Sequence, residues 1–209
     1  TNRGRRGSFI EQGPGWAQAS NTPLRLYKSF TYEGGIRVPF IARHPQWTRR
    51  GALLPCFAHV TDIAPTLLQL AGVAQTVDFW PTPVPMMQGR LMATAWSGRD
   101  TSVHDADKCT GWEMQGRNAL RQGDWKLVWS NLPWGTNEWE LFNLADDPAE
   151  SRNLALVERD RVSAMLRQWD AYVVDNGVIV ADGMADNMIY SNACRYYEDL
   201  AFDLNQAKP

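Results

Sequence analysis

Three stretches of the chain carry regular patterns of apolar and polar residues, and each pattern predicts an element. Residues 157–174 place apolar side chains every three or four positions, which is the spacing of one helix face. Residues 57–73 repeat that spacing over a shorter span. Residues 36–43 alternate apolar and polar side chains, which favours a half-buried strand. The long helical face consists of Val162, Met165, Leu166, Trp169, Tyr172 and Val173.

The helix expected within residues 57–73 has recognisable ends. Thr61 or Asp62 can cap its start by accepting backbone N–H bonds, and Pro65 is tolerated in the first turn. Gly72 suits a left-handed stop. This capping role explains Asp62 more simply than a role as a metal ligand.

Shorter alternating runs predict a small antiparallel sheet. Residues 118–122 and 125–129 flank Gly123-Asp124, a dipeptide typical of hairpin turns, and residues 139–144 predict a third strand. We expect the long helix to pack on this sheet. Residues 1–24, 74–102 and 178–209 show no sustained period and are expected to be irregular.

A lysine and a glycine pair precede the strand expected at 36–43. Gly34 and Gly35 permit positive φ, so we expect a tight turn there, and Pro39 restricts the strand to a sheet edge. Lys28 then lies on a loop held by a turn and a strand, a common way to present a functional side chain. Taken alone, a loop lysine is more often a solvated surface charge.

The segment "YKSFTYEGGIRVPFIARHP" resembles the sulfatase family, in which a lysine precedes an "EGGIRVP" turn. The resemblance covers about residues 16–174, includes "TDIAPTLLQLAGV", "ALRQGDWKLVW" and "WELFNLADDPAESRNLA", and is closest to the C-terminal part of bacterial arylsulfatases. It implies that Lys28 binds the sulfate group of a small sulfate ester. The chemistry is suitable, because an ammonium on a flexible stem meets a compact anion as a point charge.

The same resemblance implies an alkaline-phosphatase-like α/β fold. Residues 1–75 are then the last elements of the catalytic domain. Residues 76–174 form a smaller α+β domain, with an antiparallel sheet packed by a long helix, and residues 175–209 form an irregular tail.

The chain resembles only part of such an enzyme. Family members form a formylglycine in a Cys-x-Pro-x-Arg motif, a context that Cys56, Cys109 and Cys194 lack. Calcium-binding aspartates and active-site histidines lie upstream in the family. We therefore assign no catalytic residue and no metal ligand here, and we place calcium and formylglycine in a missing N-terminal catalytic segment. The isolated chain is expected to hydrolyse no sulfate esters.

Three other polar groups have simpler local interpretations. The neighbours His104-Asp105 could form an acid/base pair, but adjacent residues rarely face one another, so we expect bonding within their loop. Asp146-Asp147 precedes a proline, which is typical of a turn. The motif at residues 175–177 resembles a calcium-binding sequence, yet it stands at the end of a helix, where Asn and Gly are expected.

Composition narrows the class of function. The net charge of −2 provides no electrostatic case for nucleic-acid binding, and no apolar run approaches the length of a membrane span. We expect a soluble protein, cytoplasmic or periplasmic, whose compartment the sequence does not determine. The chain opens without Met or an apolar leader, so we expect an interior cut in a longer chain.

Two alternatives stay open. The parent protein could be a phosphonate monoester or phosphodiester hydrolase of the same superfamily. The chain could instead be a non-catalytic anion-binding or scaffold protein derived from a sulfatase. A stand-alone protein should expose a polar face at 36–43, whereas Ile36, Val38 and Phe40 favour missing neighbours, because an apolar sheet edge promotes aggregation.

Overall fold

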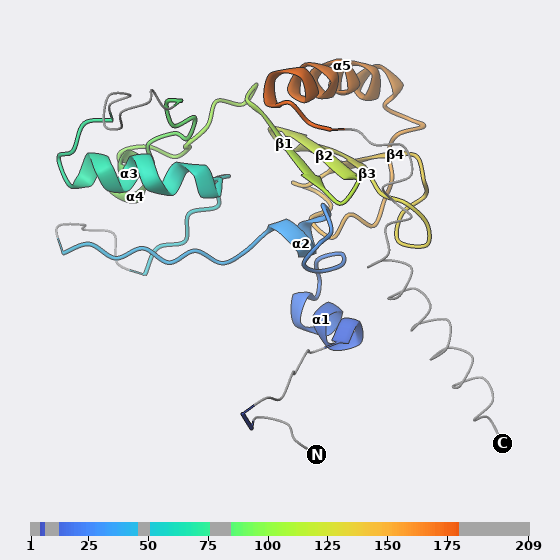
Figure 1. Ribbon diagram of the computed structural model, residues 1–209, viewed down its shortest axis with the longest axis horizontal. Coiled ribbons are helices and arrows are strands. Elements are labelled where there is room, and N and C mark those ends of the chain that lie inside the picture. The colour runs from blue at the N-terminus through green and yellow to red at the C-terminus, as the bar shows by residue number, and fades with distance from the viewer. Residues whose placement is uncertain (1–4, 7–12, 46–50, 76–84, 180–209) are drawn as a thin grey trace. The chain divides into compact units, whose positions relative to one another are not determined.

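The computed structural model describes residues 5–6, 13–45, 51–75 and 85–179, and the chain divides into two compact units (Figure 1). One unit combines Thr1–Val38 with Cys109–Pro209, and the other is Pro39–Lys108. These units do not follow the expected boundary between residues 75 and 76, which stays a prediction about domains of the parent protein. The predicted tail lies outside the described residues from position 180 onward.

The first unit contains a four-stranded antiparallel sheet in the order β1-β2-β3-β4. The expected hairpin is present, with a turn at Gly123, whose φ is +57°. The third expected strand is also present and pairs with the second strand of the hairpin. The strands are β1 (Cys109–Met114), β2 (Arg117–Gln122), β3 (Trp125–Trp129) and β4 (Trp139–Asn143).

Strand β1 was not predicted, because its composition is mixed and it contains Gly111. It pairs with β2 through a two-residue turn at Gln115 and Gly116, which both have positive φ, as a type I′ hairpin requires. Gly111 is needed because a Cβ there would meet the ring of Tyr172, whose hydroxyl donates to the Gly111 carbonyl at 3.1 Å. The glycine after Gln115 was the available signal for this hairpin.

Helix α5 (Arg159–Asn176) covers one face of the sheet, as predicted (Figure 1). Met165 and Trp169 of its apolar face are buried against inward-facing leucines of β2, β3 and β4. The helix ends at Gly177 with φ +61°, which confirms the expected stop. The leucines are Leu120, Leu127 and Leu141.

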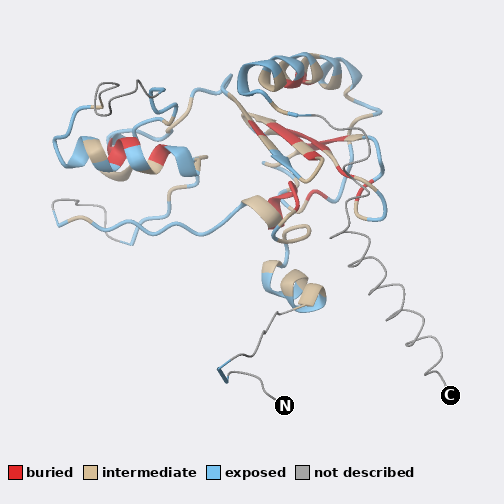
Figure 2. Ribbon diagram, viewed as in Figure 1, coloured by how far each residue is buried: buried red, intermediate tan, exposed pale blue. Residues whose placement is uncertain are grey.

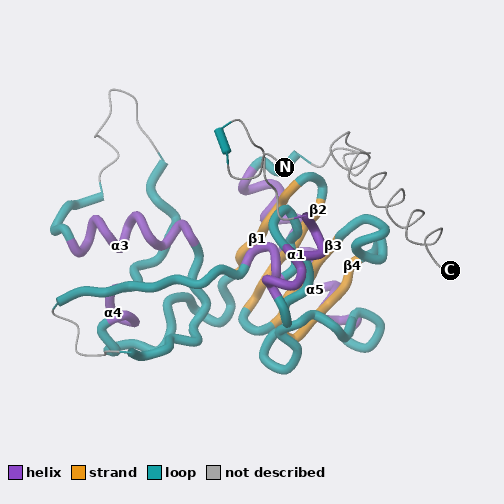
Figure 3. The backbone as a smooth tube through the Cα atoms, turned by 90° about the horizontal axis from the view of Figure 1, so that it is seen from below, coloured by secondary structure: helices purple, strands orange, loops and turns teal. Residues whose placement is uncertain are grey.

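The segment before the sheet in sequence covers the other face. Helix α1 (Gly13–Asn21) and the short helix α2 (Glu33–Ile36) lie on the side opposite α5, as the view from below also shows (Figures 1 and 3). Phe30 and Tyr32 are buried here against Ala119, Val128 and Phe142 of the strands. Buried residues accordingly gather in the strands and around α2 (Figure 2).

Two expectations for this segment are wrong. Residues 13–21 form a helix rather than a loop, because Ala17, Gln18 and Ala19 favour helix. The Ser20 hydroxyl also donates to the Trp16 carbonyl one turn earlier, at 2.8 Å. No strand forms at 36–43: Glu33–Ile36 is helical, and among the described residues the following segment pairs with no strand. Its backbone is extended at Arg37, with φ −86° and ψ 116°, but alternation alone cannot supply a neighbouring strand.

Glycine is required at positions 34 and 35 for a different reason from the one expected. Neither Gly34 nor Gly35 has positive φ. A Cβ on Gly34 would instead overlap the carbonyl oxygens of Arg25 and Leu26, and one on Gly35 would overlap that of Phe30. The pair is therefore required by close backbone approach, which folds residues 25–30 tightly against α2.

The second unit is organised by Asp62, which is fully buried. A single 3-10 turn (Val60–Asp62) leads into α3 (Ile63–Leu70), and Gly72 follows with φ +69°. The expected helix and its stop are confirmed, but the cap is different. His59 is the N-cap, and the Asp62 carboxylate accepts its backbone N–H at 2.7 Å, as in a capping box.

The same carboxylate holds two later segments of the second unit. It accepts the Arg90 N–H at 2.7 Å, close to the short helix α4 (Ala93–Trp96), and it contacts Nε2 of His104 at 2.7 Å. The expected local bonding of His104 is therefore wrong, since its partner lies 42 positions away. Asp105 instead meets Arg90 in an exposed ion pair.

The expectation for Asp146-Asp147 is also resolved by the described residues. Asp147 accepts the backbone N–H groups of Ser151 and Arg152, each at 2.8 Å, which confirms its turn role. Cys56 and Cys109 form no disulfide within the part of the chain that the structure describes, and Cys194 lies outside it. Within the described ranges, no helix combines the length and apolarity that a membrane span needs.

Candidate functional site

Lys28 occupies the corner of a hydrogen-bonded turn in the first unit. The Phe30 N–H donates to the Tyr27 carbonyl at 3.1 Å, which places Lys28 and Ser29 at the two central positions. Ser29 has φ +80°, as the third residue of a type II turn requires. Lys28 is exposed, and it forms no hydrogen bond or ion pair with any residue that the structure describes.

Contacts with the start of strand β2 attach this turn to the sheet. Nη1 of Arg117, the first residue of β2, donates to the Ser29 carbonyl at 2.6 Å. The Arg117 guanidinium also lies 4.4 Å from the ring centroid of Phe30, which is 4% exposed. The hydroxyl of Thr31 donates to the Asn118 carbonyl at 3.3 Å. The backbone on the C-terminal side of Lys28 is therefore attached to the start of β2.

A buried ionic cluster fixes α2 on the same sheet face. Nζ of Lys126 on β3 lies 2.8 Å from a carboxylate oxygen of Glu33 and 2.8 Å from one of Glu150. The Glu33 N–H donates to Glu150 at 2.6 Å. Burial raises the pKa of Glu150, while the Lys126 ammonium favours its ionised form. Because a buried charge needs partners, these three residues depend on one another.

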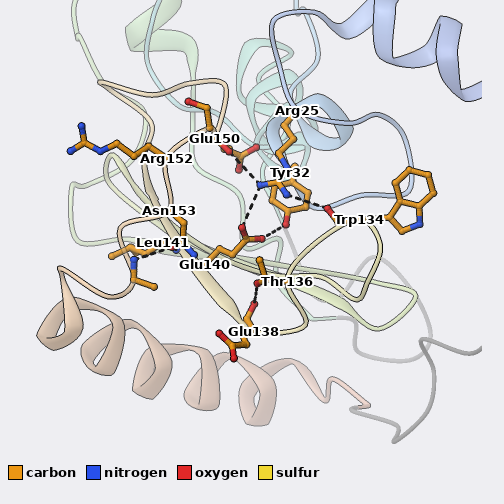
Figure 4. Close-up of polar contacts among 12 residues, drawn as sticks. Arg25, Tyr32, Trp134, Thr136, Glu138, Glu140, Leu141, Glu150, Arg152 and Asn153 are labelled. Atoms are coloured by element: carbon orange, nitrogen blue, oxygen red, sulfur yellow. Dashed lines mark hydrogen bonds and ion pairs between the residues drawn. The ribbon is translucent and has the colours of Figure 1, made fainter.

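A second polar group joins the loop before Lys28 to β4. Arg25 lies 4.0 Å over the ring of Tyr32, and both side chains are directed at the buried Glu140 (Figure 4). Arg25 also donates to the Trp134 carbonyl at 3.1 Å. Burial and then the hydrogen bond to Glu140 raise the pKa of Tyr32 well above its usual value, so the phenol stays neutral and donates.

What the site offers chemically is one exposed ammonium on a rigidly supported backbone. The described residues contain no cluster of three or more His, Cys, Asp or Glu side chains that could hold a metal ion. The Asp62–His104 pair in the second unit is almost completely buried, with exposed fractions of 0% and 8%, so it holds chain segments together. Lys28 itself was singled out from the sequence, and its role stays a prediction.

The residues that support Lys28 were not identified from the sequence. Arg117, Lys126 and Glu140 each stand two positions from an apolar residue that is buried on the same sheet face. Side chains two positions apart in a strand point to the same face, so these charged residues lie on the sheet face that α2 covers. Opposite charges at such positions in neighbouring strands were a signal available in the sequence.

Three comparisons with known proteins bear on this site. A family model described as N-sulphoglucosamine sulphohydrolase, C-terminal, matches residues 25–170. An uncharacterized sulfatase of Schizosaccharomyces pombe is 36% identical over 196 residues, which cover 90% of this chain and 34% of that protein. An arylsulfatase of Klebsiella aerogenes is 39% identical over 89 residues, or 42% of this chain and 19% of the relative. The chain thus spans about a third or less of these relatives.

A solved structure shares the fold. The crystal structure of Ps i-CgsB in complex with k-i-k-neocarrahexaose aligns with a TM-score of 0.62 and 22% identity, covering 90% of this chain and 39% of that one. This likeness agrees with the expected α/β fold of alkaline-phosphatase type, C-terminal part.

Proposed function

Because the chain belongs to the sulfatase family, we propose that it forms the C-terminal part of a sulfuric ester hydrolase that cleaves sulfate monoesters, and that Lys28 binds the sulfate group. The remaining part of such an enzyme supplies the nucleophile and the metal site. By itself the chain then hydrolyses no sulfate ester.

The observation that carries the proposal is the presentation of Lys28. On this sheet face Lys126 is buried and paired with Glu33 and Glu150, and Arg25 is paired with Glu140. Lys28, in contrast, is exposed and lies in a turn that is anchored on strand β2. A supported ammonium without a protein counter-ion suits a compact anion, because it keeps its charge available for the ligand.

The family's calcium and formylglycine do not fit the described residues. No described cluster could hold a metal ion, and neither Cys56 nor Cys109 lies in a Cys-x-Pro-x-Arg sequence. We therefore assign both groups to the N-terminal catalytic segment of the proposed enzyme, and we derive no catalytic step through them in this chain.

Exposed apolar residues after α2 support the idea that further chain completes the enzyme. Val38 is 76% exposed and Ile41 is 92% exposed, next to an extended backbone. Apolar residues on an extended segment are usually covered by neighbouring strands. This favours a missing sheet neighbour over the stand-alone scaffold alternative.

The test is substitution of Lys28 in the full-length protein that contains this chain. We expect Lys28→Ala to lower kcat/KM for an aryl sulfate by about a hundredfold, the effect typical of removing one group that stabilises developing charge. Lys28→Arg should retain part of the activity, and the exposed Lys108→Ala should match the parent. A loss below threefold for Lys28→Ala would contradict the proposal.

Matched sulfate and phosphate esters of one phenol separate the alternatives. The proposal predicts a higher kcat/KM for the sulfate ester, whereas preference for the phosphate ester would favour a phosphohydrolase parent. The 209-residue chain alone should turn over neither ester.

A further inference from the structure

We propose that Arg117 is a positioning residue that sets the place of the Lys28 ammonium by holding the carbonyl of Ser29. This inference rests on the proposed function, in which Lys28 binds the sulfate group. It goes beyond it by assigning control of the sulfate-binding lysine to a residue of the C-terminal sheet, 89 positions farther along the chain than Lys28 (117 − 28).

Arg117 contacts the turn at two points, since Nη1 donates to the Ser29 carbonyl at 2.6 Å and the guanidinium covers the ring of Phe30 at 4.4 Å. Ser29 directly follows Lys28, and Phe30 supplies the N–H that closes the turn onto Tyr27. Arg117 therefore contacts both residues that follow Lys28, while the lysine side chain stays exposed.

Ser29 adopts φ +80°, a conformation that non-glycine residues seldom take and that an outside contact must stabilise. The hydrogen bond from a charged donor to the Ser29 carbonyl is such a contact. Without it, the peptide between Ser29 and Phe30 keeps the Phe30 N–H bond to the Tyr27 carbonyl but loses the charged donor at its oxygen. We therefore expect this peptide to rotate more readily and the Cα–Cβ bond of Lys28 to change direction.

Arg117 is 1% exposed, so its charge has been removed from water at a considerable cost. A planar guanidinium can stack flat on a ring and donate from its edge in a fixed direction, whereas a lysine ammonium has no plane to stack and no fixed fork of donors. Arg117 also starts β2 directly after the hairpin turn at Gly116, and its backbone is paired with Met114, so its Cα cannot shift easily.

The experiment is a double-mutant cycle in the full-length protein, with inorganic sulfate as a competitive inhibitor. Arg117→Lys is combined with Lys28→Ala, and Ki for sulfate, KM and kcat are measured for all four proteins. We expect Arg117→Lys alone to raise Ki and KM about tenfold, because a displacement of about 1 Å in a binding group has effects of this order or larger. In the Lys28→Ala background, the same change should alter Ki less than about twofold.

A control at an exposed arginine and a second readout separate positioning from general damage. Arg161 on α5 also stacks on a ring, 4.1 Å from Trp125 on the opposite sheet face, and Arg161→Lys should leave Ki unchanged. Amide hydrogen exchange of the peptide spanning residues 27–32 should become faster in Arg117→Lys, while peptides of β3 stay protected. Arg117→Gln provides a second variant with the charge removed.

The outcomes are distinct. Equal losses from Arg117→Lys in both backgrounds would overturn the inference, because a purely structural defect does not depend on Lys28. An unchanged Ki for Arg117→Lys beside a raised Ki for Lys28→Ala would overturn the inference but not the proposed function. An unchanged Ki for Lys28→Ala would overturn the proposed function and this inference together.

Discussion

Nζ of Lys126 lies 2.8 Å from a carboxylate oxygen of Glu33, and both side chains are buried between β3 and α2. This contact joins residues 93 positions apart in sequence. It attaches α2, the helix that follows the Lys28 turn, to the sheet. Arg117 attaches the turn itself to the sheet in the same way. The sheet of the first unit therefore serves as the support of the candidate sulfate-binding residue.

Removing the Lys126 charge should destabilise this support strongly. Lys126→Met leaves Glu33 and Glu150 buried without their shared cation, so we expect a loss of about 3–5 kcal/mol in the free energy of unfolding. Urea unfolding followed by tryptophan fluorescence measures it. Lys108→Met removes an exposed lysine and should stay within about 0.5 kcal/mol of the parent. A Lys126→Met loss no larger than that of the control would contradict this role.

A methyl group on Gly35 should be poorly tolerated. Its Cβ would overlap the carbonyl oxygens of Tyr27 and Phe30, so Gly35→Ala must push the Lys28 turn away from α2. We expect a loss of about 3 kcal/mol in stability, as for overpacked cores. Gly15→Ala is the matched control, since its Cβ points into open space within α1 and alanine favours helix by up to about 1 kcal/mol. Equal stability of the two variants would contradict the close-approach explanation.

The second unit should lose stability on mild acidification. Burial lowers the pKa of His59 below its ordinary value of 6.5, and this effect is larger than that of the Asp62 charge, which raises the pKa. Below about pH 6.5 the unfolded chain therefore binds more protons than the folded chain at this site, and the free energy of unfolding falls as the pH drops toward the folded pKa.

The variant His59→Asn tests this pH dependence, because asparagine keeps an N-cap acceptor but does not titrate. Urea midpoints at pH 8 give the pH-independent effect of the substitution, and midpoints at pH 5.5 give the acid response. We expect a smaller decline between these two pH values in the variant. Equal declines would show that His59 does not contribute to acid sensitivity.

The elements with a strong local pattern were predicted correctly from the sequence. The hairpin around Gly123 and the helix stop at Gly177 follow from turn chemistry and periodicity, and the apolar face of α5 packs on the sheet as expected. Lys28 was expected on a loop and lies in a turn, while its sulfate-binding role stays a prediction. Each of these features depends on residues close together in the chain.

The features that were missed depend on distant residues. The partner of His104 is 42 positions away, and the reason for Gly34 is a backbone segment folded back from Arg25 and Leu26. A strand was expected after α2 because alternation indicates extended backbone, but pairing needs a neighbour that alternation does not reveal. Arg117 was missed because its contact with Ser29 exists only once β2 and the turn are packed together.

The most direct test is a crystal structure of the full-length protein with sulfate bound. We predict that Nζ of Lys28 lies within about 3 Å of a sulfate oxygen and that Nη1 of Arg117 still donates to the Ser29 carbonyl. Sulfate bound at a site where Lys28 remains in solvent would contradict the central claim that this chain supplies a sulfate-binding lysine.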